Sequence, residues 1–256
     1  MKKVIIKGKE IMLYESIDEM PIANFQKYNK CLLIDSGIGS NIDDIDNHIV
    51  KIARYIKSNK ESAIKELKNM RQNLIMISSG ISPKYLAFAA LIHSIDGKAL
   101  TDLSDTNLSS ILESFKEVKH SWLVDLLAKI KKKINTELEL YFPDEFINPK
   151  EKETYDRLKQ RTLLVLEGIK DSKDNSSEID KIDDYLFGLH KPLSFDGDTS
   201  AEIKYDKQYE TMCILIAQKT NLNAKAMTVL QFYSALDSMK RQAEAEKKIT
   251  NRHKKR

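Results

Sequence analysis

The residues best suited to catalysis form the tripeptide Asp35-Ser36-Gly37, which follows Leu32-Leu33-Ile34. Aspartic proteases place a catalytic aspartate in such a loop, after apolar strand residues, and need a second aspartate to share its proton. The residues before Asp35 recur with a helical rather than a strand period, and the sequence has no second Asp-Ser-Gly or Asp-Thr-Gly triplet. We therefore interpret the tripeptide as the end of a helix closed by glycine.

Phosphate-binding and metal-binding motifs are incomplete in this chain. Gly37-Ile38-Gly39 lacks the later glycine, lysine and Ser/Thr of a P-loop. The acidic clusters at 43–46 and 196–198 lack the full set of ligands and the closing glutamate of an EF-hand. The histidines show no pair at metal-ligand spacing and no neighbouring cysteine: His48, His93, His120, His190 and His253. We predict no metal, no cofactor and no enzymatic activity.

Positive charge is concentrated at the C-terminus. From Met239 to Arg256 there are eight Lys or Arg and two Glu, a net charge of +6 in a chain of net charge +4. Such a segment could neutralise phosphates, dock on an acidic protein or remain a solvated, disordered terminus. No aromatic residue follows Tyr233, so this segment offers no stacking platform for bases. The candidate partner-binding residues are Lys240, Arg241, Lys247, Lys248, Arg252, Lys254, Lys255 and Arg256.

The composition is typical of a helix-rich globular protein. Hydrophobic residues make up 41% and charged residues 31%, with 8 Gly and 5 Pro among 256 residues. No run approaches the roughly 20 apolar residues that span a bilayer, and Met1-Lys2-Lys3 precedes only three apolar residues, so we expect neither a membrane span nor a signal peptide. Cys31 and Cys213 lie in apolar periodic segments, which predicts buried free thiols in a reducing compartment.

The elements that must position these residues are helices, above all in the block from Asn41 to Ile95. Breaks at Ser58-Asn59 and Gly80 divide this block into three predicted helices, the third with Ser82 as N-cap and Pro83 at its first position. A helix with one apolar stripe must bury it, so we predict that the block forms an antiparallel helical core. The stripe consists of Ile42, Ile45, Ile49, Ile52, Ile56, Ile64, Leu67, Leu74, Ile77, Leu86, Phe88, Leu91 and Ile95.

The remaining elements flank this block. The first fourteen residues read as two short strands around Gly8. A lone hairpin is marginally stable, so we expect it to dock on the helical body, to pair with Leu138 to Phe142 or to pair with another chain. Thr228 and Gln231 predict a capping box. Other predicted helices cover residues 21–36, 108–115, 122–133 with its lysines at the C-terminal end, 149–169, 179–186, 205–216 and 228–250.

The predicted fold class is mainly α, a multi-helix bundle with a small N-terminal β-hairpin and an extended basic C-terminal helix or arm. We divide the chain into four segments. They are a hairpin arm at 1–20, a helical body at 21–170, a C-terminal helical subdomain at 171–238 and the basic arm at 239–256.

Two stretches resemble virion structural proteins of Bacteroides-infecting tailed phages, especially the short-tailed crAss-like phages. The first runs from Pro21 to Tyr28 and continues from Leu32 to Ser40, and the second runs from Met70 to Leu74 and continues from Gly80 to Phe88. The similarity covers about the first hundred residues. It implies a ring or adaptor protein of the head–tail connector, present in many symmetric copies beneath the portal, whose terminal arms contact the portal and other tail or ring proteins.

The residues leave other functions open. A nucleic-acid-binding packaging or cargo protein could use the basic tail and Lys129 to Lys133 to contact packaged DNA. A tail-assembly chaperone is a further alternative. For the ring or adaptor we expect a homo-oligomer located in the virion, made in the host cytoplasm and free of membrane contact.

Overall fold

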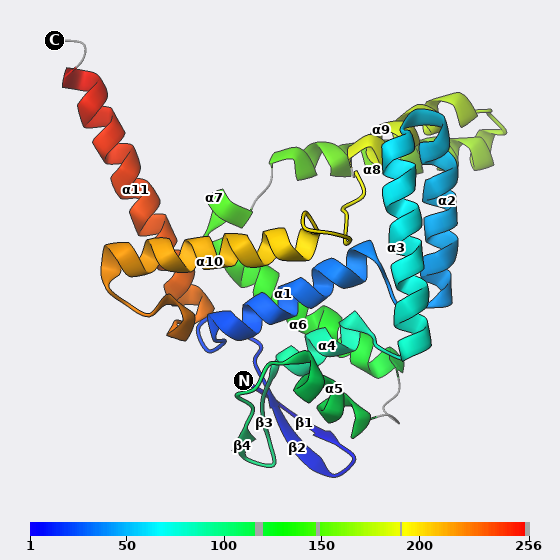
Figure 1. Ribbon diagram of the computed structural model, residues 1–256. Coiled ribbons are helices and arrows are strands. Elements are labelled where there is room, and N and C mark those ends of the chain that lie inside the picture. Colours follow the sequence, from blue (N-terminus) through cyan, green and yellow to red (C-terminus); the bar gives the residue numbers. More distant parts are fainter. Residues whose placement is uncertain (116–119, 147–148, 190, 254–256) are drawn as a thin grey trace.

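The computed structural model describes residues 1–115, 120–146, 149–189 and 191–253 of the chain. Over these ranges the fold is mainly α-helical, as predicted, with a small antiparallel sheet near the N-terminus (Figure 1). The elements in chain order are β1 (Lys2–Ile6), β2 (Lys9–Leu13), α1 (Ile22–Gly37), α2 (Ile42–Ser58), α3 (Lys60–Ser79), α4 (Pro83–Ala90), β3 (Ile92–Ile95), β4 (Lys98–Ala99), α5 (Asp105–Glu113), α6 (His120–Tyr141), α7 (Pro143–Phe146), α8 (Pro149–Asp171), α9 (Ser176–Leu189), α10 (Ala201–Thr220), the 3-10 turn η1 (Ala224–Ala226) and α11 (Val229–His253).

The N-terminal hairpin becomes part of a four-stranded sheet with the order β1-β2-β3-β4. Strand β2 pairs antiparallel with β3, with Ile11 opposite Ile95. The hairpin therefore pairs within its own chain and not with Leu138 to Phe142, a segment that belongs to α6 and its end. Ile95, predicted to be helical, lies in β3. The turn at Asp96-Gly97 has two positive φ values, 48° and 77°, which favour a tight hairpin there.

One apolar core joins the sheet to α1, α4, α6, α10 and α11. Its fully buried side chains include Tyr28, Phe88, Ile92, Ile130 and Phe232. Both cysteines are buried and free, as predicted. The cluster from Lys129 to Lys133 lies in the middle of α6 and not at its end, because an apolar stripe continues the helix past the lysines. The buried residues of that stripe are Leu127, Ile130, Ile134 and Leu138.

The α2–α3 hairpin corrects the prediction for the central block. The breaks fall at Asn59 and Gly80, and α4 starts at Pro83 behind Ser82, all as predicted. The apolar stripe of α2 and α3 is not the core, however. Most of it faces solvent, and the side chains that these two helices bury are largely polar: His48, Ser62, Glu66, Asn69 and Asn73, with Tyr55 and Ala63.

The two ends of the molecule are formed by the α8–α9 hairpin and by α11, which lie on opposite sides in Figure 1. Helix α8 is tied to the start of α9 by the Asn175 amide, which donates to the Leu164 carbonyl over 2.9 Å. Helix α11 starts with the predicted capping box, in which Thr228 and Gln231 each donate a backbone N–H to the other's side chain, over 3.1 and 3.3 Å. In the described part of the chain, no helix is both long and apolar enough to span a bilayer.

Candidate protein-interaction surfaces

The base of α11 is held rigidly by the core. Val229 and Phe232 are completely buried. The Ile22 N–H donates to the Met227 carbonyl, and the Val229 N–H donates to the Met20 carbonyl, each over 2.9 Å. The first turns of α11 are therefore fixed, and the later turns extend away from the body (Figure 1).

The predicted partner-binding cations divide into three groups. Lys240 pairs with Glu145 over 2.7 Å, and this hydrogen bond raises the pKa of Lys240. Arg241 pairs with Asp237, one turn earlier on α11, over 2.9 Å. Lys247 is exposed. Lys248 and Arg252 belong to α11, but their side chains are outside the described set, and Lys254, Lys255 and Arg256 lie outside the described residues altogether.

An acidic segment runs from the end of α8 through α9, at the other end of the molecule, and back to the start of α10 (Figure 1). Residues 171–202 contain nine Asp or Glu and three Lys, a net charge of −6. Asp183 accepts two hydrogen bonds from Arg161 over 2.5 and 3.0 Å, which lowers the pKa of its carboxyl. Asp180 and Asp184 are exposed and lie four residues apart on α9, opposite the buried Ile182, so they share its outer face.

An apolar face covers one side of the α2–α3 hairpin. On α2 the exposed fractions are 71% for Ile42, 52% for Ile49 and 60% for Ile56, and on α3 Leu67 and Leu74 are about half exposed. Single exposed apolar side chains are ordinary on protein surfaces, but a contiguous row of them marks an interaction site. We call these five residues the hairpin face.

A buried polar network lies where α2 and α3 face each other, next to the hairpin face. The His48 Nδ1 lies 2.9 Å from Glu66 Oε1, and its Nε2 donates to the Ile38 carbonyl over 2.8 Å. The Asn73 amide donates to the same carbonyl over 2.8 Å. Lys51 reaches Glu66 over 3.3 Å. Each of these buried side chains thus makes at least one hydrogen bond or ion pair, which offsets the cost of burying it, although Asn73 Oδ1 has no partner among the described residues.

Charges in this network stabilise one another. Burial alone lowers the pKa of His48, but its hydrogen bonds to Glu66 and to the Ile38 carbonyl raise that pKa by more. Burial alone raises the pKa of Glu66, and the hydrogen bond to His48 together with the charge of Lys51 brings that pKa below its usual value. The pair is therefore an imidazolium and a carboxylate, with both ring nitrogens of His48 donating.

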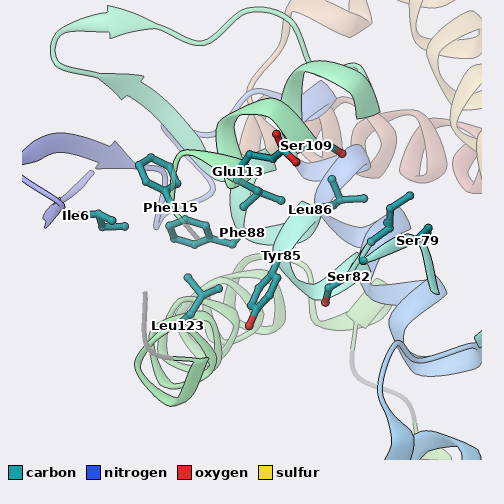
Figure 2. A pocket seen from close by; sticks show the side chains of 13 residues that line it. Ile6, Ser79, Ser82, Tyr85, Leu86, Phe88, Ser109, Glu113, Phe115 and Leu123 are labelled. Atoms are coloured by element: carbon teal, nitrogen blue, oxygen red, sulfur yellow. The ribbon is translucent and has the colours of Figure 1, made fainter. Parts of the chain in front are cut away.

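A pocket of about 340 Å³ lies between the end of α3 and the helices α4, α5 and α6. Figure 2 shows Ile6 and Phe115 at one end and Ser79 and Ser82 at the other. Glu113 carries the one carboxylate among the described residues that line it. This lining suits an apolar side chain better than a charged substrate.

The candidate catalytic residue Asp35 lies inside α1, which ends at Gly37 as predicted. Its nearest cation is Lys84 at 3.8 Å, and burial raises the pKa of its carboxyl. Gly37 has a packing role, because a Cβ there would lie 2.2 Å from the Phe195 ring. Within the described ranges, no group of three His, Cys, Asp or Glu side chains is placed to hold a metal ion.

Comparison with known proteins gave no match: no family model, no curated protein and no solved structure matches this chain. Sequence periodicity identified the residues of the hairpin face but assigned them to the core. The signal against that assignment was a second stripe, Glu66, Asn69 and Asn73, at helical spacing on α3.

Proposed function

We propose that this protein is a non-enzymatic structural subunit that assembles head to tail into a ring or adaptor. In this assembly α11 of each copy docks on the acidic segment 171–202 of the next copy. One observation carries the proposal: the C-terminal part of α11, with a net charge of +3 over residues 239–253, and α9 with the loop before it, with a net charge of −4 over residues 171–189, lie on opposite sides of one molecule (Figure 1). Two unlike surfaces that match each other produce a heterologous contact, which closes into a ring when the rotation allows.

The binding free energy of this contact depends on how many ion pairs form together. A single exposed ion pair is worth roughly 0 to 1 kcal/mol, so several pairs must act together. Their main effects are to steer the partner and to fix its orientation, and both weaken as salt rises. Asp180 and Asp184, on the outer face of α9, are the acceptors best placed for Lys247 of another copy.

The exposed area supports a subunit of a larger assembly. The chain exposes 16633 Å². A compact monomer of 29.4 kDa exposes about 11,500 Å². The excess comes from the projecting α11 and the two helical hairpins, α2–α3 and α8–α9, whose apolar side chains remain in solvent.

The place of this assembly is the portal–tail junction of a virion. That part of the proposal is supported by the resemblance of the stretches at 21–40 and 70–88 to crAss-like phage virion proteins. The expected partners are further copies of this chain, the portal and other tail or ring proteins. The protein is made in the host cytoplasm and retained in the virion.

Charge reversal in the arm tests the head-to-tail contact. We expect the wild-type protein to form closed particles in negative-stain images and by mass photometry at low salt. The double variant Lys247→Glu and Lys248→Glu should lose them. Mixing this variant with Asp180→Lys and Asp184→Lys should restore mixed particles, since each contact then regains opposite charges.

A control with the same change in net charge is Lys9→Glu with Lys98→Glu, two exposed residues on β2 and β4. This control should assemble like the wild type. Loss of particles in the control, or their persistence in the arm variant, would contradict the proposed contact.

The packaging or cargo alternative makes a different prediction for the same arm. It expects duplex DNA binding whose affinity falls steeply with salt and disappears when residues 247–256 are removed, in a protein that forms no rings. A tail-assembly chaperone would bind a tail protein but be missing from the finished virion. Mass spectrometry of purified particles separates that alternative from a ring subunit.

A further inference from the structure

The hairpin face is a second exposed surface that no other described part of the chain covers, distinct from the arm and from the acidic segment. It consists of Ile42, Ile49 and Ile56 on α2 with Leu67 and Leu74 on α3. We propose that the same face of a second copy covers it, so that two α2–α3 hairpins pack into an antiparallel four-helix bundle. The contact would be isologous, with a two-fold axis near Ile49.

The geometry of the hairpin makes these residues one face. Ile49 directly follows the buried His48, and Leu67 directly follows its partner Glu66, so each lies about 100° around its helix from the contact between α2 and α3. Viewed from one end of the hairpin, one of two antiparallel helices turns clockwise along its sequence and the other turns counterclockwise. A step in the same sequence direction therefore turns both side chains to the same side of the hairpin. Ile56 after Tyr55 repeats the relation toward the turn that joins the two helices, and Leu74 after Asn73 repeats it toward the opposite end of the hairpin.

The charges along α2 indicate a second copy as the occupant. The first half of the helix carries Asp43, Asp44 and Asp46, and the second half carries Lys51, Arg54 and Lys57. An antiparallel copy places the acidic half of each α2 beside the basic half of the other. With the axis near Ile49, residue 57 of one copy is level with residue 41 of the other, so the exposed Asp43 lies only about 3 Å along the bundle from the exposed Lys57 of the other copy. A parallel copy would bring like charges together, so the pattern selects one orientation.

The apolar spacing also suits helix pairing. The isoleucines of α2 recur at alternating three- and four-residue steps, the a and d positions of a coiled-coil seam. Hairpins of antiparallel helices that meet through such seams form four-helix bundles. The proposed pairing uses neither α11 nor residues 171–202. It therefore goes beyond the ring contact and can fail or succeed independently of it.

Cysteine cross-linking tests the position of the axis. Ile49→Cys should give a disulfide-linked dimer on mild oxidation, because each residue 49 faces its counterpart near the axis. Ile42→Cys alone should not, since two residues 42 lie about 21 Å apart along the bundle, whereas Ile42→Cys with Ile56→Cys should. The native Cys31 and Cys213 are buried and contribute little background.

Leu140→Cys, at a position on α6 that is more exposed than Ile49, is the control and should stay monomeric on oxidation. The pairing would be overturned if Ile42→Cys alone formed as much disulfide-linked dimer as Ile49→Cys. It would also be overturned if neither Ile49→Cys nor the double variant formed such a dimer. Truncation after Met239 should leave the Ile49→Cys dimer intact while abolishing rings. This truncation separates failure of the pairing from failure of the proposed function.

Association measurements test the energetics. In sedimentation experiments Ile49→Asp should weaken dimerisation at least tenfold, and Leu140→Asp should not. Asp43→Lys and Lys57→Asp should each weaken it, while the two together should restore it, because the swap again places opposite charges side by side. A wild-type and an Ile49→Asp protein with the same association constant would refute the proposal, provided that circular dichroism shows both to be folded.

Discussion

The imidazole of His48 lies between the Glu66 carboxylate and the Ile38 carbonyl, both within 2.9 Å. These contacts join α2, α3 and the end of α1 at one buried point. Turning α2 to bury its isoleucines would move His48 into solvent and leave Glu66 buried without its main partner. Breaking a buried ion pair in this way costs about 3 to 5 kcal/mol. The network therefore orients the hairpin.

A prediction at this scale concerns pH. The raised pKa of His48 means that its contribution to stability is complete below the ordinary histidine value of about 6.5 and is lost as pH rises through the raised value. The lowered pKa of Glu66 means that its contribution is lost only as pH falls through that lowered value. We expect His48→Ala to reduce the free energy of unfolding by about 3 kcal/mol at pH 6, and by less at pH 9.

Urea unfolding at a series of pH values measures this effect. Glu66→Gln is the companion variant, because it removes the carboxylate while keeping its shape. Its stability should vary less than that of the wild type between pH 6 and pH 9. A cost of His48→Ala that stays constant over this range would mean that the pair is not ionised.

At the scale of elements, the end of α1 depends on a glycine that makes room for a distant loop. A Cβ on Gly37 would lie 2.2 Å from Phe195 Cε2, and Phe195 is buried. We expect Gly37→Ala to destabilise the protein by about 1 to 3 kcal/mol through overpacking, measured by urea or thermal unfolding. Phe195→Leu in the same chain should recover part of the loss.

The matched control for this prediction is Gly188→Ala in α9, where an added Cβ meets nothing within 4 Å. There the alanine should stabilise the helix by about 0.5 to 1 kcal/mol, because glycine is a poor helix former. Equal effects of the two substitutions would show that the Phe195 contact does not limit the end of α1.

At the scale of the whole molecule, the projecting elements predict a large radius of gyration. A compact chain of this length has a radius of gyration of about 18 Å. We expect small-angle X-ray scattering of a monomeric variant, such as Ile49→Asp combined with Lys247→Glu and Lys248→Glu, to give a clearly larger value. A value near 18 Å would mean that α11 and the α8–α9 hairpin fold back on the body.

The sequence by itself determined the local features. Breaks at Asn59 and Gly80, the Ser82-Pro83 helix start and the Thr228 capping box all depend on neighbouring residues in the chain, and each is present in the structure. The mainly helical fold follows from the same periodicity. The sequence also identified the basic C-terminal segment, because its net charge follows from residue types alone and does not depend on the fold.

Only the tertiary structure decided which side of a helix is buried. Periodicity shows that α2 has an apolar stripe, but burial depends on what the opposite stripe can bind. His48, Glu66 and Asn73 meet distant partners, and the Ile38 carbonyl can be placed beside them only by the fold. The pairing of β2 with β3 has the same cause, since a strand finds its neighbour through contacts far apart in the chain. Contacts between residues far apart in the chain therefore decided that the apolar stripe of α2 and α3 lies mostly on the surface and not in the core.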